Sequence, residues 1–101
     1  MKFEVVTPLG FTVRTSEGYW QRLMGKHPDL EELEELVTLT LALPDEIRRS
    51  SHDAGVLLFY RQRQEKRWVV AVARRLNGDG FLITAYQTDG ITILLQKLTQ
   101  K

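Results

Sequence analysis

The spacing of apolar residues changes at Pro44 from a helical to an alternating pattern, and this change limits the folds open to the chain. Before Pro44, apolar residues such as Trp20, Leu23 and Met24 fall three and four positions apart, which is the spacing of one helix face. After Pro44 they alternate with polar residues or form short runs between turn signals, which is typical of strands. The sequence therefore predicts an α+β fold in which the helices precede the sheet.

Two helices are predicted before Pro44. The first is capped by Thr15 or Ser16 and is broken at Gly25, because serine and threonine are good N-caps and glycine weakens a helix. The second begins at Pro28 and ends at Pro44, since proline suits the first helical position and interrupts a helix interior. The acidic residues in its first turns favour the same start.

The remaining segments are expected to be strands. Lys2–Thr7 and Phe11–Arg14 alternate around a Pro–Leu–Gly turn, which indicates a short N-terminal β-hairpin ahead of the helices. Short connections later in the chain favour an antiparallel sheet of four to five strands, with the helices on one face. Its predicted strands are Glu46–Ser51, Val56–Gln62, Arg67–Arg75 and Phe81–Gln87, with Ile91–Leu95 as a last strand or a docked tail.

The length and composition bound the remaining possibilities. A chain of 101 residues is expected to form a single domain, 1–101, with one core. It has no cysteine, which excludes disulfides, thiolate nucleophiles and cysteine-based zinc sites and fits a reducing cytosol. The N-terminus does not resemble a signal peptide, and the apolar runs are too short to cross a bilayer. We therefore expect a cytoplasmic protein with no membrane association.

The charges are segregated although the formal net charge is only +1. Between His27 and Glu46 every charged residue is acidic, whereas arginine and lysine dominate from Arg48 to Arg75. A locally basic sheet would attract a phosphate backbone at short range, because salt screens more distant charges. The alternative is a solvated sheet whose charges discourage pairing between sheet edges.

Most motifs that identify an activity are missing. The chain has no P-loop, no dinucleotide fingerprint and no HExxH sequence. It has only two histidines, which lie in different predicted loops, so the sequence predicts no metal site and no cofactor. Any chemistry has to come from ordinary polar side chains.

Polar residues on otherwise apolar elements are the candidates for that chemistry. His27 lies at the corner between the two predicted helices, and an imidazole there suits a general acid or base, or merely a helix cap. Thr84 and Tyr86 share one face of their strand, which makes that face less apolar than a core face. Tyr60 ends an apolar strand and is either a core ring or a surface for stacking a base.

The arginines complete a set of groups suited to cutting RNA without metal. Arg48 and Arg49 lie on opposite faces of one predicted strand, as do Arg74 and Arg75 of another, so one arginine of each pair would point to the face of Tyr86. Arginine binds phosphate bidentately and keeps its charge. A base would remove the 2′-hydroxyl proton, arginine would stabilise the phosphorane, and an acid would protonate the 5′-oxygen.

The sequence resembles the barnase–EndoU–colicin–RelE-like group of small nucleases, and in particular toxins of the RelE and BrnT type. The resemblance covers roughly His27 to Asp89 and leaves out the N-terminal hairpin. It lies in His27-Pro28, Leu43–Ser50, Leu57–Arg61, Gly80–Tyr86 and Thr88-Asp89.

The resemblance implies a metal-independent endoribonuclease that acts as the toxin of a toxin–antitoxin pair, with RNA as substrate and an antitoxin protein as partner. It assigns catalysis to His27, Arg48, Tyr60, Thr84 and Tyr86, with Arg61 and Arg74 as further RNA-binding residues. Two alternatives remain open. One is a non-catalytic module on the same fold that binds RNA or protein. The other is an enzyme with Thr84 or Ser50 as nucleophile, for which the chain lacks a recognisable elbow or triad.

Overall fold

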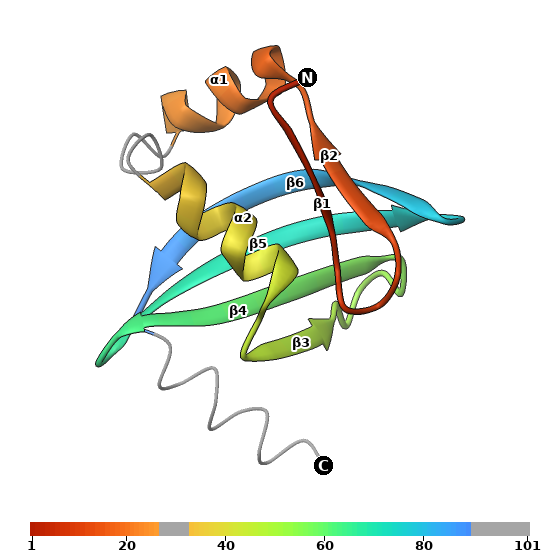
Figure 1. The fold of residues 1–101 in the computed structure, drawn as a ribbon. Helices are drawn as coiled ribbons and strands as arrows, with labels where there is room; N and C mark the ends of the chain where they lie inside the picture. Colours follow the sequence, from red (N-terminus) through yellow and green to blue (C-terminus); the bar gives the residue numbers. More distant parts are fainter. Residues whose placement is uncertain (27–32, 90–101) are drawn as a thin grey trace.

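The computed structural model describes residues 1–26 and 33–89. Within these two ranges, two helices and six strands follow one another (Figure 1). The predicted order of hairpin, helices and sheet is confirmed. The elements are β1 (Phe3–Val6), β2 (Thr12–Thr15), α1 (Glu17–Lys26), α2 (Glu34–Ala42), β3 (Glu46–Arg49), β4 (Val56–Gln64), β5 (Arg67–Leu76) and β6 (Asp79–Thr88).

All six strands belong to one mixed sheet in the order β1-β2-β6-β5-β4-β3. The four strands after the helices pair antiparallel, as predicted. The prediction differs in that the N-terminal hairpin joins them, which makes the sheet six-stranded and mixed. The N-terminal hairpin joins the sheet edge through β2, which runs parallel to β6 from Thr12, opposite Asp79, to Arg14, opposite Phe81. A parallel pairing between segments so far apart in the sequence leaves no local pattern to predict it from.

The helices cover one face of the sheet, as predicted (Figure 1). Ser16 caps α1 by accepting a hydrogen bond from the Tyr19 amide, with 3.1 Å between the amide nitrogen and Oγ. Trp20 and Leu23 of α1 and Val37 and Leu41 of α2 pack into the main core beneath them. Each pair has the helical spacing of three or four residues that the sequence shows.

The hairpin curls over the same face and completes the core. Phe11, at the start of β2, is fully buried, and its ring centroid lies 6.3 Å from that of Phe59 in β4. Because β6 and β5 lie between β2 and β4, this contact requires a strongly curled sheet. The guanidinium group of Arg75 lies over the Phe11 ring, with its central carbon 5.1 Å from the ring centroid.

Two predicted features fall outside the described residues. These are the corner at His27 with the helix start at Pro28, and the segment Ile91–Leu95. Helix α2 is described from Glu34 onward and ends at Ala42, two residues before Pro44. Within the described ranges no helix is long and apolar enough to cross a membrane.

Candidate functional site

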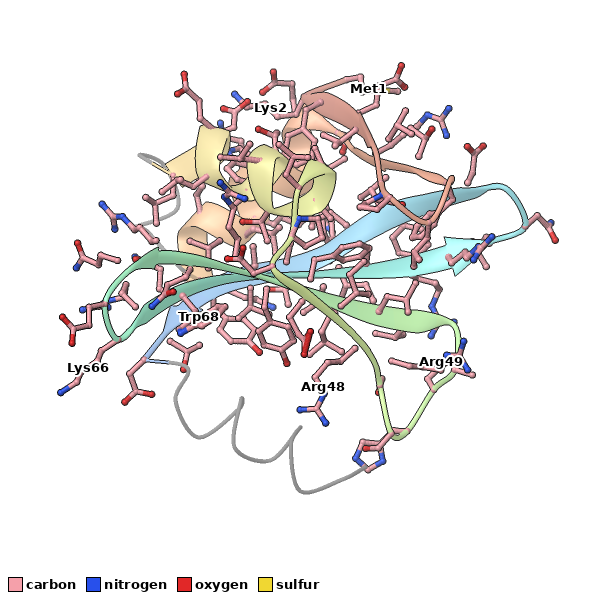
Figure 2. All side chains as sticks on the ribbon, turned by 60° about the horizontal axis from the view of Figure 1, so that its bottom comes forward. Met1, Lys2, Arg48, Arg49, Lys66 and Trp68 are labelled. Carbon is pink, nitrogen blue, oxygen red and sulfur yellow. The ribbon has the colours of Figure 1, made fainter. Side chains whose placement is uncertain are left out.

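The sheet face opposite the helices carries a second, smaller apolar cluster, which we call the aromatic face. Its members come from the three central strands β4, β5 and β6. Figure 2 shows Trp68 and Arg48 projecting from this side of the sheet, away from the helices. The cluster consists of Leu58, Tyr60, Trp68, Val70, Val72 and Tyr86.

The strand register places the predicted catalytic residues together on the aromatic face. Tyr60 of β4 lies opposite Val70 of β5, which lies opposite Tyr86 of β6. The neighbouring row runs from Arg48 through two apolar residues to Thr84. At about 4.8 Å between strands, Tyr60 and Tyr86 are about 10 Å apart along the row. Four of the five residues assigned to catalysis therefore share one face.

The aromatic face is well shielded from water at its centre and more open around it. Val70 is completely buried, and Tyr60 and Trp68 expose only 4% and 7% of their surface. Arg48, Thr84 and Tyr86 are each partly exposed. Tyr60 therefore has too little free surface to stack on a base, whereas Tyr86 keeps some accessible surface.

Electrostatics connect the two tyrosines with Arg48. Burial raises the pKa of the Tyr60 hydroxyl, the nearby Tyr86 raises it further, and the positive charge of Arg48 offsets part of the increase. Burial also raises the pKa of Tyr86. Both hydroxyl groups therefore stay protonated at neutral pH, where they can donate a hydrogen bond or a proton but cannot act as bases.

The two arginines predicted to bind RNA, Arg61 and Arg74, both have partners within the protein. Arg61 lies on the opposite face of β4 from Tyr60 and donates a hydrogen bond to the Leu43 carbonyl. Arg74 alternates with Val72 on β5 and so lies on the aromatic side, but its guanidinium is paired with Asp53. Their predicted part in RNA binding stays a prediction.

His27, the predicted general acid or base, lies outside the described residues. The other histidine, His52, is exposed in the turn between β3 and β4, as its loop-like sequence indicated. Among the described residues there is no group of three or more histidine or carboxylate side chains that could hold a metal ion.

Sequence reasoning missed two residues of the aromatic face. Trp68 belongs to the cluster, and Glu46 lies directly opposite Tyr60 at the start of β3. Both could have been found by continuing the alternation, because Trp68 is two residues before Val70 and Glu46 two before Arg48. Strand β5 is apolar on both faces, so its sequence alone does not show which residues face the helices and which belong to the aromatic face.

No protein-family model matches this sequence, and no curated protein and no solved structure shows significant similarity to it.

Proposed function

We propose that this chain is a metal-independent endoribonuclease that binds RNA on its aromatic face. The observation that supports this most is the register of the sheet, which gathers Arg48, Tyr60, Thr84 and Tyr86 on one face. A cation and protonated hydroxyl groups around an apolar centre suit a phosphate with its flanking sugar and base. The resemblance to small nucleases points to the same chemistry.

Each group has a definite part in the proposed reaction. His27 takes the proton of the 2′-hydroxyl, and the 2′-oxygen attacks the neighbouring phosphorus. Arg48 stabilises the charge of the phosphorane, with a hydrogen bond from Thr84. Tyr86 gives its proton to the 5′-oxygen as the P–O5′ bond breaks. The products are a 2′,3′-cyclic phosphate and a free 5′-hydroxyl. Burial keeps Tyr86 protonated for this step, and Tyr60 lies in the same row of the sheet.

A second candidate function is RNA binding without cleavage. It is favoured by the two raised tyrosine pKa values, because neither hydroxyl can remove a proton at neutral pH. The described part of the aromatic face holds no histidine. On this reading Arg48 and Tyr86 would bind the phosphate and the base, and no bond would break.

Cleavage of a fluorescent single-stranded RNA in EDTA tests the proposal. Arg48→Ala should slow cleavage by about 100-fold, a typical effect of losing one group that stabilises the transition state. Tyr86→Phe and His27→Ala should slow it as well. The matched control is Arg49→Ala, because Arg49 is the exposed neighbour of Arg48 on the opposite face of β3. Its cleavage rate should stay close to that of the wild type.

The outcomes separate the candidates. Salt-dependent RNA binding that is lost in Arg48→Ala, without any cleavage, supports the binding module and rejects the nuclease. Equal behaviour of Arg48→Ala and Arg49→Ala, or no binding to RNA at low salt, rejects both. We extend the nuclease proposal to a toxin acting on cytoplasmic RNA with an antitoxin as partner. Induced expression should then stop bacterial growth, and Arg48→Ala should relieve the arrest.

A further inference from the structure

The centre of the aromatic face is more deeply buried than its described neighbours explain. Trp68 exposes only 7% of its surface and Tyr60 only 4%, although both helices pack on the opposite face of the sheet (Figure 1). Side chains on a sheet stand roughly perpendicular to it, so neighbours in the same layer shield the flanks of a ring but not its outer surface. An almost completely buried tryptophan on this face therefore needs a further segment packed over it.

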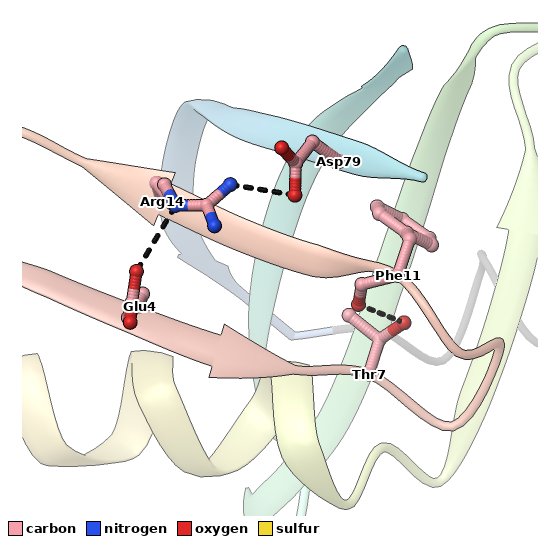
Figure 3. Close-up of polar contacts among 5 residues, drawn as sticks. All are labelled: Glu4, Thr7, Phe11, Arg14 and Asp79. Carbon is pink, nitrogen blue, oxygen red and sulfur yellow. Dashed lines mark hydrogen bonds and ion pairs between the residues drawn. The ribbon is translucent and has the colours of Figure 1, made fainter. Parts of the chain in front are cut away.

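The N-terminal hairpin is held elsewhere and cannot be that segment. Arg14 of β2 pairs with Glu4 of β1, with 3.0 Å between Nε and Oε2, and with Asp79 of β6, with 2.6 Å between Nη1 and Oδ1 (Figure 3). The Thr7 hydroxyl closes the hairpin turn by donating a hydrogen bond to the Phe11 carbonyl at 3.0 Å. Because the Phe11 side chain belongs to the main core, the hairpin is fixed on the side of the helices.

Of the residues outside the described ranges, 90–101 are the ones positioned to reach the aromatic face. The other such segment, 27–32, joins two helices that both lie on the opposite side. The chain leaves β6 at Thr88, which lies directly opposite Trp68 in β5. Asp89 and Gly90 are residue types that favour turns. The segment that follows can therefore fold back across the face, starting beside the Trp68 ring.

The sequence of this segment has the pattern of an amphipathic helix. Four of its apolar residues are spaced at i, i+3, i+4 and i+7, which places them on one helix face. These residues, which we call the tail stripe, are Ile91, Leu94, Leu95 and Leu98. Ile93 is the apolar residue of the segment that falls outside the stripe, among the polar positions.

The dimensions of the aromatic face match those of a helix of this length. From Trp68 to Val72, β5 extends over about 13 Å, and the eight residues from 91 to 98 would span about 12 Å as a helix. Across the strands, Tyr60 and Tyr86 are about 10 Å apart, close to the diameter of a helix with its side chains, about 10 to 12 Å. One short helix along β5 would cover the centre of the face and leave its margin partly open.

We propose that residues 91–98 form an amphipathic helix that packs along β5 and covers the aromatic face. Burial of the tail stripe against Trp68 and its apolar neighbours favours the packed state. This is the surface to which we assign RNA, so the helix and RNA exclude each other there, and the helix is autoinhibitory. The inhibition rests on the proposed function, whereas the packing of the helix does not.

A spin label on the full chain tests the packing. The chain has no cysteine, so Gln96→Cys provides a single attachment site for a nitroxide, on the polar side of the proposed helix. In amide ¹H–¹⁵N spectra, the nitroxide should broaden the signals of Trp68 and Tyr86 far more than those of Trp20 and Leu41, which belong to the main core. The reduced label gives the reference spectrum. Absence of broadening at Trp68 would overturn the proposal.

Leu94→Ser and Ile93→Ser form a matched pair, because they change adjacent residues of which only Leu94 belongs to the tail stripe. Leu94→Ser should make hydrogen exchange of the Trp68 indole N–H about tenfold faster, since losing one buried aliphatic side chain makes the uncovered state about that much more populated. Ile93→Ser should leave this rate unchanged, and the Trp20 indole serves as an internal reference. Equal effects of the two variants, or a larger effect of Ile93→Ser, as an extended segment would give, would overturn the helix.

Titration with single-stranded RNA tests the inhibition. RNA should remove the broadening at Trp68, and Leu94→Ser should bind RNA up to about tenfold more tightly than Ile93→Ser, because less of the protein is in the covered state. RNA binding that leaves the broadening at Trp68 unchanged would overturn the inhibition. Broadening at Trp68 without any binding of RNA would confirm the packing and reject both the RNA-binding function and the inhibition that rests on it.

Discussion

At the scale of single residues, Gly80 shows how closely the hairpin packs on the sheet. A Cβ atom at Gly80 would lie 2.6 Å from the carbonyl oxygen of Arg74 and 2.8 Å from the ring of Phe11. The first neighbour is backbone and the second is a fully buried ring, so neither can move aside at small cost. Gly80 therefore allows Phe11 to lie flat against β6.

Gly80→Ala should lower the free energy of unfolding by about 1–3 kcal/mol, the usual cost of overpacking a core. Gly78→Ala is the matched control, because Gly78 lies two residues away in the adjoining turn and a Cβ there has no neighbour within 4 Å. Urea unfolding at pH 7 measures both. If the two variants are equally stable, the close contact between Phe11 and Gly80 is not present in solution.

At the scale of elements, the turn between β3 and β4 is fastened to β5 by Asp53. One carboxylate oxygen accepts a hydrogen bond from the Gly55 amide at 2.8 Å, and the other is paired with Arg74. The Gly55 carbonyl in turn accepts a hydrogen bond from the Arg75 amide. The hydrogen bond from Arg74, then that from Gly55, lower the pKa of Asp53 below its ordinary value.

This shift predicts a pH-dependent difference between the wild type and Asp53→Asn. Because the pKa is lower in the folded state than in the unfolded state, ionised Asp53 stabilises the fold above the unfolded value of about 3.9. That stabilisation is lost as the pH falls through the folded pKa. The wild type should therefore be the more stable protein at pH 7, and the two should converge in acid.

Urea midpoints of both proteins between pH 7 and pH 2.5 measure this difference. Asparagine can still accept the hydrogen bond from Gly55, so the comparison isolates the charge of Asp53. The difference should be small, because the pair is partly exposed, and it should shrink in high salt. A difference that stays constant across the pH range would contradict the assigned role of the charge.

The elements that sequence analysis predicted well are those whose pattern is local. Alternation located the strands around Phe59 and Ala71, and helical spacing located α1 through Trp20. It also predicted that one of Arg48 and Arg49 lies on the side of Tyr86, because the side-chain period of a strand is two, and in the structure this is Arg48. Pairing between β2 and β6 depends on distant residues and left no periodic signal.

The candidate site was predictable to the same extent. The shared face of Thr84 and Tyr86 followed from alternation, whereas the burial of Tyr60 depends on neighbours from other strands. The pairing of Arg74 with Asp53 also could not be predicted, since it joins a strand to a turn about 20 residues earlier.

At the scale of the whole molecule, the hairpin is part of the core rather than an addition to it. Phe11 and Val13 are both fully buried within the main cluster, although neither belongs to the aromatic face. Removing residues 1–15 would uncover this side of the core and the edge of β6. Such a loss of apolar burial exceeds the usual stability margin of a domain of this size.

Deletion of residues 1–15 should therefore abolish cooperative unfolding, even though the deleted part contributes nothing to the aromatic face. The control is Leu9→Ser, which changes an exposed residue of the hairpin turn and should unfold like the wild type. Urea titration followed by tryptophan fluorescence distinguishes the two. A shortened chain that still unfolds in one sharp transition would show that the residues after Thr15 form a sufficient core.

The parallel pairing of β2 with β6 also has a consequence for how the protein is made. The hairpin is synthesised before the helices, but its partner strand β6 is the last of the described strands to be made. Until Phe81 has emerged, Phe11 and Val13 have no strand beside them on that edge. A nascent chain with this order exposes an apolar hairpin until β6 has been made, and chaperones that bind such segments have an opportunity there throughout the synthesis of the strands in between.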